Sequence, residues 1–289
     1  MQKALITDIK RFAVNDGDGI RTTVFFKGCP LKCVWCHNPE GLMFEAQTAF
    51  FEHKCVNCGA CVKACPQNAH TFADGKHAFF RENCGGCNKC VSVCTGEAMV
   101  RYGKEMTADE ILPVILEDRC FYEESGGGIT LSGGECLCQA DFCAELLEKC
   151  KREGIDTAVD TCGFVPRQSI EKVLPFTDTF LYDIKAMDED VHIKCTGQSN
   201  GIILENLRYI DSLGKAIEVR IPFILKYNDD QIGKIAEFLQ GLKNIKKVKV
   251  LPYHNFAGSK YDALGIENTL PDELADMQAV ERLNQMFER

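Results

Sequence analysis

Two short cysteine runs constrain the fold of this chain more than any other feature. The stretches "CVNCGACVKACP" and "CGGCNKCVSVC" each space four cysteines as C-x2-C-x2-C-x3-C. In this spacing, three neighbouring thiolates hold three corners of a 4Fe-4S cube, and the fourth cysteine crosses to the other cluster. A segment with eight such ligands in so short a length must fold around metal. The eight cysteines are Cys55, Cys58, Cys61, Cys65, Cys84, Cys87, Cys90 and Cys94.

The same spacing predicts which cysteines share a cluster. The first cluster is expected on Cys55, Cys58, Cys61 and Cys94. The second cluster is expected on Cys84, Cys87, Cys90 and Cys65. Zinc is the alternative, but a zinc site usually pairs two C-x2-C knuckles and has no use for a third and fourth cysteine in each run. The module resembles a bacterial two-cluster ferredoxin over nearly its whole length; such clusters relay electrons or simply hold a loop together.

Length and composition indicate the compartment and exclude some partners. The 289 residues suffice for one large α/β domain, or for a domain with an insert. Eighteen cysteines without an apolar signal segment or a bilayer-length run predict a reducing cytoplasm, where clustered thiols bind metal. A net charge of -9 opposes attraction to nucleic acid or anionic lipid, so neither a nucleic acid nor a membrane is expected as a partner. The seven cysteines from Cys120 to Cys195 are interpreted as small core residues.

Short β-rich runs alternate with helical stretches, chiefly beyond residue 105. Apolar stripes at helical spacing stop at Gly154 and Gly214, which is typical of helix ends. This alternation predicts parallel strands joined by right-handed crossovers. Six such units fall short of the eight in a full barrel, so we expect an α/β fold with an incomplete (β/α)6 TIM-like barrel, open at the side. The predicted strands are Thr22–Lys27, Ile129–Ser132, Thr157–Asp160, Thr179–Ile184, Ile217–Phe223 and Lys247–Leu251.

One segment interrupts the alternation. Residues 48–104 are dense in Cys, Gly and Asn and contain two similar halves, which predicts an inserted ferredoxin-like domain with two 4Fe-4S clusters. Three parts follow from this interpretation: 1–47 as the start of the barrel with a cluster loop, 48–104 as the insert, and 105–289 as the remainder of the barrel.

A third cysteine motif precedes the insert. The stretch "FFKGCPLKCVWCHNPEG" places Cys29, Cys33 and Cys36 in the spacing C-x3-C-x2-C. Three thiolates can hold three irons of a 4Fe-4S cube and leave one iron without a protein ligand. A small molecule with an amino and a carboxylate group can chelate that open iron, as substrates do at catalytic metals. The alternative is a zinc site of three cysteines completed by His37.

The stretch "DGDGIRTTVFFKGCPLKCVWCHNPE" resembles the signature of the radical S-adenosylmethionine (SAM) enzymes. More narrowly, the chain resembles over essentially its whole length the activating enzymes of glycyl radical enzymes, typified by pyruvate formate-lyase activase. The resemblance implies that Cys29, Cys33 and Cys36 carry the catalytic cluster, so that the chain holds three 4Fe-4S clusters in all. It also implies that Trp35 lies beside the adenine of SAM, and Asp16 in the lead-in is our candidate contact to the partner's glycine loop.

Later motifs of the resemblance stand at the predicted strand ends, where barrel enzymes keep their chemistry. They are "LSGGE", "DTCG", "YDIK", "VRIPF" and "LPYHNF". Singly, each has a structural explanation as a helix cap, a turn or a satisfied histidine. Together they imply SAM contacts, with a monovalent cation between the two strand-end aspartates. Cys136 stands where the family commonly has proline. The implied contacts are Gly133, Gly134, Glu135, Asp160, Asp183, Lys185, Arg220 and His254.

The resemblance also implies a reaction. One electron cleaves SAM to methionine and a 5'-deoxyadenosyl radical, which takes a hydrogen from a glycine of a partner glycyl radical enzyme. For chains with a two-cluster insert, that partner is expected to be a dehydratase, lyase or decarboxylase; a flavodoxin or ferredoxin as electron donor and a monomeric state are expected as well. The alternatives are a radical SAM enzyme for a small molecule or a peptide, and a non-catalytic ferredoxin-type electron carrier. Peptide-modifying members usually carry extra cysteines at the C-terminal end, and here none follows Cys195.

Overall fold

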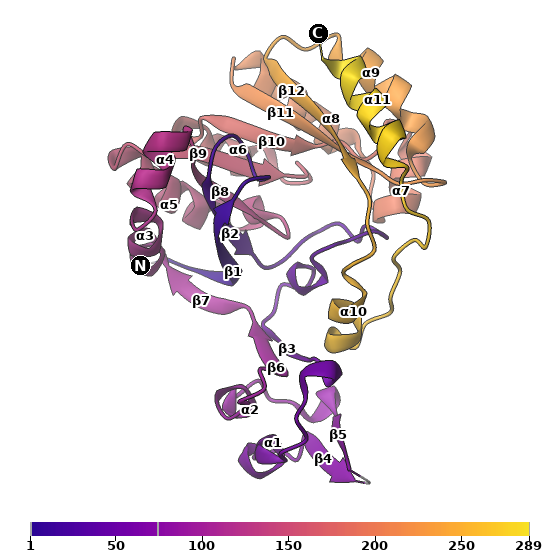
Figure 1. The fold of residues 1–289 in the computed structure, drawn as a ribbon. Helices are drawn as coiled ribbons and strands as arrows, with labels where there is room; N and C mark the ends of the chain where they lie inside the picture. Colours follow the sequence, from indigo (N-terminus) through magenta and orange to yellow (C-terminus); the bar gives the residue numbers. More distant parts are fainter. Residues whose placement is uncertain (1, 74, 289) are drawn as a thin grey trace.

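One mixed sheet of eight strands forms the body of the molecule (Figure 1). In the computed structural model, which describes residues 2–73 and 75–288, the strand order is β12-β11-β10-β9-β8-β2-β1-β7. The run from β2 to β12 is parallel throughout, so the predicted parallel α/β architecture is confirmed. Each predicted strand coincides with one of these six. They are β2 (Arg21–Phe26), β8 (Gly128–Gly133), β9 (Asp156–Thr161), β10 (Thr179–Asp183), β11 (Ala216–Phe223) and β12 (Ile245–Pro252).

Two antiparallel strands extend the sheet beyond β2, and sequence patterns did not predict them. β1 (Lys3–Ala13) pairs with β2, and β7 (Lys104–Thr107) pairs with β1. β1 buries Ala4 and Ile6 on one face and exposes polar residues on the other, as expected for a half-covered strand. The sheet therefore ends at β12 on one side and β7 on the other, rather than closing on itself.

Helices connect the parallel strands. The predicted helices ending at Gly154 and Gly214 are confirmed as α5 and α8, and both glycines adopt a positive φ of 73°. None of the helices among the described residues combines the length and apolar composition needed to cross a membrane. The helices of the body are α3 (Ala108–Leu116), α4 (Arg119–Ser125), α5 (Ala140–Arg152), α6 (Arg167–Val173), α7 (Glu189–Thr196), α8 (Gly201–Ser212), α9 (Ile232–Leu239), α10 (Gly258–Leu264) and α11 (Met277–Phe287).

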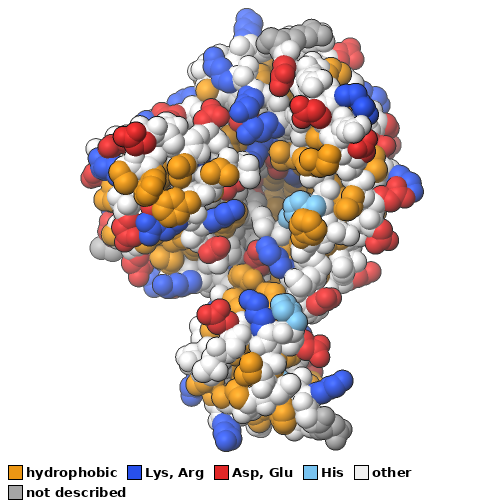
Figure 2. Space-filling model, viewed as in Figure 1, with side chains coloured by type: hydrophobic (Ala, Val, Ile, Leu, Met, Phe, Trp, Pro, Cys, Tyr) orange, Lys and Arg blue, Asp and Glu red, His pale blue; other side chains and the backbone are white. Residues whose placement is uncertain are grey.

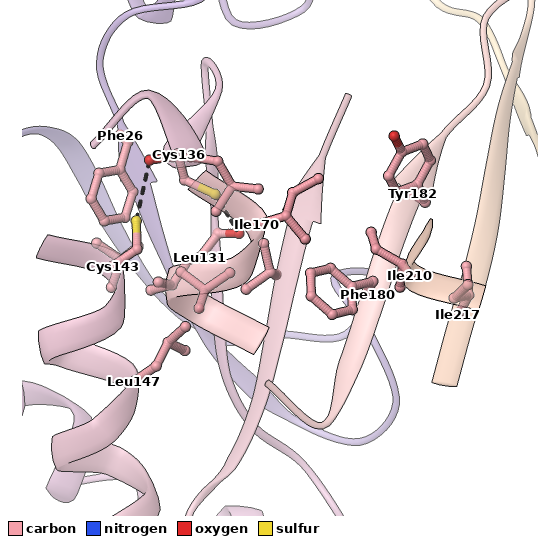
Figure 3. Close-up of a cluster of buried hydrophobic side chains, with 14 of the residues drawn as sticks. Phe26, Leu131, Cys136, Cys143, Leu147, Ile170, Phe180, Tyr182, Ile210 and Ile217 are labelled. Atoms are coloured by element: carbon pink, nitrogen blue, oxygen red, sulfur yellow. Dashed lines mark hydrogen bonds between the residues drawn. The ribbon is translucent and has the colours of Figure 1, made fainter. Parts of the chain in front are cut away.

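The core lies between the sheet and these helices (Figure 3). Strand residues such as Leu131 and Phe180 pack there with Leu147 of α5. Cys136 and Cys143 are also fully buried, and their thiols face the carbonyl oxygens of Leu131 at 3.6 Å and Cys136 at 3.2 Å. The interpretation of the later cysteines as core residues fits five of them. It is wrong for two, Cys120 and Cys138, which are exposed.

The cysteine-rich segment projects from the body at the lower end of the view in Figure 1. β3 pairs with β6, and β4 pairs with β5 as a separate hairpin. Ala49 and Phe51 pack on Ala263 and Leu264 of α10, which joins the segment to the body. Its elements are β3 (Gln47–Phe50), α1 (Ala60–Ala64), β4 (His70–Ala73), β5 (Lys76–Phe79), α2 (Lys89–Ser92) and β6 (Met99–Tyr102). Single 3-10 turns occur at Pro39–Gly41, Glu52–Lys54, Arg81–Asn83, Cys136–Gln139, Leu174–Phe176 and Asp229–Gln231.

Candidate cofactor cavity and cysteine sites

A cavity of about 630 Å³ opens at the carboxyl ends of the parallel strands, on the face shown in Figure 2. Parallel α/β sheets bind ligands at this edge because the loops that follow the strands converge there. The volume lies within the range of small-molecule sites. Glu135 and Asp16 are not among the lining residues. Those predicted site residues that do line it are Cys29, Cys33, Trp35, Cys36, Gly133, Gly134, Asp160, Asp183, Lys185, Arg220 and His254.

The loop after β2 brings Cys29, Cys33 and Cys36 to one wall of the cavity. Burial raises the pKa of the Cys33 and Cys36 thiols to about 12, so their thiolates need a cation to stabilise them. The three free thiols of Cys29, Cys33 and Cys36 around one cavity fit the donor set of an iron-sulfur cluster. The zinc alternative is weaker, because His37 directs Nε2 to the carbonyl oxygen of His254 at 2.6 Å and stacks on its ring.

The end of β8 supports this loop through backbone contacts. The Glu135 amide donates to the Gly28 carbonyl oxygen at 2.8 Å. A Cβ on Gly134 would lie 2.4 Å from the Gly28 oxygen and 2.5 Å from the Gly41 oxygen, so no larger residue fits. Gly134 therefore has a structural reason to lack a side chain that the sequence interpretation did not include: the end of β8 touches the cysteine loop.

Glu135 points away from the cavity into the protein. Its carboxylate accepts hydrogen bonds from the Thr161 hydroxyl and the Cys162 amide, each at 2.8 Å, and from the Leu137 amide at 3.0 Å. Burial raises the pKa of this carboxyl group, and the surrounding donors oppose that effect. The resemblance implied a SAM contact for Glu135, whereas its side chain holds the end of β9 against the end of β8.

Two ion pairs form another part of the cavity wall. Lys185 Nζ lies 2.9 Å from Asp183 Oδ2, and Arg220 Nη1 lies 3.1 Å from Asp160 Oδ2. Burial alone would lower the pKa of Lys185, but Asp183 and the nearby thiols outweigh it and raise that pKa. Burial raises the pKa of Asp160, and Arg220 opposes the shift. The wall thus presents paired charges that a zwitterionic ligand can bridge.

Arg220 also ties the lead-in segment to this wall. Its Nη2 donates to the Asn15 carbonyl oxygen at 2.6 Å. The next residue, Asp16, accepts from the Thr23 hydroxyl at 2.8 Å, and its carboxylate lies 3.9 Å from Arg220 Nη2. The side chain predicted to contact a partner is therefore partly engaged inside the protein, beside the cavity.

Helix α10 supports the cysteine loop through contacts that the sequence did not predict. The Tyr261 hydroxyl donates to the Cys36 carbonyl oxygen at 3.0 Å. Lys260 Nζ donates to the His37 carbonyl oxygen at 3.1 Å and pairs with Glu40 at 2.6 Å. These contacts join residues more than 200 positions apart, and no local sequence pattern predicts them.

The projecting segment contains two hollows lined by cysteines. Phe50 and Met99 complete the lining of the first hollow, and Thr48 and Gln67 that of the second. Each hollow gathers three cysteines of one run and the last cysteine of the other, all of them free. The first hollow contains Cys55, Cys58, Cys61 and Cys94. The second contains Cys65, Cys84, Cys87 and Cys90.

A parallel α/β sheet with three free thiols at the ends of its strands is the architecture of a radical SAM enzyme. The profile of the radical SAM superfamily matches residues 23–239, and the chain belongs to this family. The family implies a 4Fe-4S cluster and SAM, which the three cysteines and the cavity fit. The protein is therefore an enzyme rather than a non-catalytic electron carrier.

Two characterised relatives are similar over nearly their whole length. The trans-4-hydroxy-L-proline dehydratase activating enzyme of Clostridioides difficile is 45% identical over 98% of this chain and 96% of its own. The choline trimethylamine-lyase activating enzyme of Oleidesulfovibrio alaskensis is 42% identical, with 97% and 94% covered. The structure of Streptococcus suis SuiB bound to precursor peptide SuiA shares the fold, with a TM-score of 0.57 at 14% identity, over 89% of this chain and 42% of that one.

Proposed function

We propose that this protein activates a glycyl radical enzyme by removing a hydrogen atom from one glycine of that partner. The observation that carries the proposal is the cavity, which is lined by Cys29, Cys33 and Cys36 together with two ion pairs and whose volume suits SAM. Relatives that match nearly the whole chain are named activating enzymes, which supports this choice over a small-molecule or peptide substrate. The cluster and SAM would supply an electron and a 5'-deoxyadenosyl radical.

The chain's own residues would hold and orient SAM. Cys29, Cys33 and Cys36 would ligate three irons and leave the fourth for the amino and carboxylate groups of SAM. Lys185 would pair with the methionine carboxylate. The exposed ring of His254 would complete the rim beside His37.

Two further contacts belong to this assignment. Trp35 is buried, with its ring edge-on to Tyr227, so a rigid aromatic wall would meet the adenine. Asp160 and Asp183 both line the cavity, and a monovalent cation between their carboxylates would relieve the repulsion between two buried charges. Gly133 and Gly134 would let the backbone approach the methionine amino group.

The partner would approach through the lead-in segment. Arg220, which lines the cavity, donates to the Asn15 carbonyl oxygen and lies close to Asp16, so a cavity residue fixes the position of the lead-in segment. The proposed contact between Asp16 and the partner's glycine loop would therefore form beside bound SAM. The names of the relatives favour a dehydratase or lyase as the partner.

Residues 48–104 would form a ferredoxin-like domain with two 4Fe-4S clusters, bringing the total to three. The crossed grouping of cysteines in the two hollows supports this assignment. The remaining parts, 1–47 and 105–289, would make up the barrel. The enzyme would act as a monomer in the cytoplasm and take its electron from a flavodoxin or ferredoxin.

The test begins with anaerobic reconstitution and measurement of 5'-deoxyadenosine formed from SAM after reduction. Wild type should cleave SAM, and Cys33→Ser should not, while Cys120→Ser should match wild type because Cys120 is an exposed thiol outside the three sites. Incubation with the hydroxyproline dehydratase or choline lyase partner should then give a glycine-centred doublet by electron paramagnetic resonance. Cleavage of SAM without a radical on any candidate partner would favour the small-molecule or peptide alternative.

A further inference from the structure

Two buried histidines lie between the cysteine hollows of the projecting segment. His70 begins β4 and His77 belongs to β5, and the hairpin places His70 Nδ1 2.9 Å from His77 Nε2. Their exposed fractions are only 3% and 9%. His77 lines the first hollow and His70 lines the second. The histidine pair therefore forms part of the wall that separates the two hollows.

His77 directs both ring nitrogens at ligands of the first site. Its Nε2 lies 3.4 Å from Cys61 Sγ, and its Nδ1 lies 3.8 Å from Cys55 Sγ. A neutral imidazole carries its proton on one of these two nitrogens. With the proton on Nδ1, the N–H of His77 faces Cys55 Sγ and Nε2 accepts from His70; with the proton on Nε2, the N–H lies between His70 Nδ1 and Cys61 Sγ. The bond to His70 and the edge contact with Phe50 at 4.4 Å fix the ring in this orientation.

The second site receives a different environment. His70 uses Nδ1 for His77, and its ring stacks on Phe79 with centroids 4.8 Å apart. Among the described residues, His70 makes no hydrogen bond to a cysteine of the second site, where Cys65 accepts instead from the Ala69 amide at 3.3 Å. Only the first site thus has an imidazole nitrogen close to its cysteine sulfurs among the described residues.

We infer that His77, oriented by His70, raises the reduction potential of the first-site cluster above that of the second. The inference rests on the proposed clusters of residues 48–104. A reduced cluster carries more negative charge on its sulfurs, so an N–H donor stabilises the reduced form more than the oxidised form. His77 is a positioning residue here, because it acts on the thiolate ligands and not on a substrate.

The order of potentials gives the segment a direction. β3 begins at Gln47, whose side-chain oxygen accepts a hydrogen bond from Lys27, the residue after β2, at 2.9 Å. Further along β3, Thr48 lines the second hollow and Phe50 lines the first. Along the chain, β3 therefore reaches the lining of the second hollow before the lining of the first. An electron arriving from outside would rest on the first cluster, whose potential is higher, until the catalytic site draws it.

The experiment uses the full chain with Cys29, Cys33 and Cys36 replaced by alanine, so that only the clusters of the projecting segment are observed. Redox titration followed by electron paramagnetic resonance should resolve two midpoints, and Cys58→Ser assigns the one that belongs to the first site. His77→Phe should lower that midpoint by about 59 mV, which corresponds to a tenfold change in the equilibrium constant for one-electron reduction. The second midpoint should stay unchanged.

Two further variants make the outcome specific. His77→Gln keeps an N–H donor and should retain part of the difference, and His53→Phe, a change at an exposed histidine of the same segment, should alter neither midpoint. Unchanged midpoints in His77→Phe at full iron content would overturn the inference. Failure of wild type to bind iron, or zinc bound by Cys61, His70 and His77 at the expense of iron, would instead overturn the proposed clusters and the inference with them.

Discussion

Arg220 offers the sharpest test of the cavity wall. Its guanidinium is buried, lies 3.1 Å from Asp160 and donates to the Asn15 carbonyl oxygen at 2.6 Å. Arg220→Met keeps much of the side-chain volume and removes the charge. The variant leaves Asp160 with the Ser132 hydroxyl at 2.6 Å as its remaining partner. We expect most of the loss of stability to come from the Asp160 carboxylate, which stays in place without its cation.

The magnitude follows from these contacts. Removing one partner of a buried ion pair costs about 3–5 kcal/mol, because the other charge stays buried. The hydrogen bond from Ser132 and the opening to the cavity reduce that cost, whereas the lost bond to Asn15 adds about 1 kcal/mol. We therefore expect Arg220→Met to lower the free energy of unfolding by about 2–4 kcal/mol at neutral pH.

Urea unfolding of the iron-free chain measures this loss without interference from the clusters. Arg220→Met combined with Asp160→Asn should regain about half of it, because no unpaired carboxylate remains. Without Arg220 the pKa of Asp160 rises further above its unfolded value, so the folded state binds more protons and the deficit should shrink on acidification. A double variant no more stable than the single, with a deficit independent of pH, would refute the reasoning.

Three other outcomes are expected. Gly134→Ala should abolish iron binding at the catalytic cysteines, because its Cβ would meet a loop carbonyl oxygen at 2.4 Å, whereas Gly154→Ala, with open space around it, should keep full iron content. Tyr261→Phe should cost about 1–2 kcal/mol in urea unfolding, since the Cys36 carbonyl loses its donor; an unchanged midpoint would contradict this. Burial lowers the pKa of Lys27 to about 8 from 10.5, so the stability of wild type relative to the Lys27→Met variant should rise with pH between those values.

The parallel strands were predictable because each is a short β-rich run and helical stretches alternate with these runs along the chain. β1 was not, since its alternating residues suit any half-covered strand and its partners, β2 and β7, lie at very different separations along the chain. Exposed Cys120 and Cys138 show the same limit, because a cysteine's burial depends on what packs over it.

The strand-end motifs predicted which residues meet at the cavity better than what each one does there. Gly134 lies against two loop carbonyl oxygens, and Glu135 binds Thr161 and Cys162 inside the protein. Both positions follow from the way β8 and β9 end side by side, which a motif does not describe. A motif predicts where a residue lies along its strand, whereas the direction of its side chain depends on the residues packed around it.

The sequence by itself predicted how the cysteines group and the order of the parallel strands' motifs, because cysteine spacing and apolar periodicity are local. Only the tertiary structure decided the contacts that orient them: Tyr261 on the Cys36 carbonyl and Arg220 on the Asn15 carbonyl. It also decided that His77 faces the sulfurs of one site, through a hairpin that turns it toward Cys55 and Cys61. Such contacts join distant residues whose types are ordinary, so they arise only when the chain has folded.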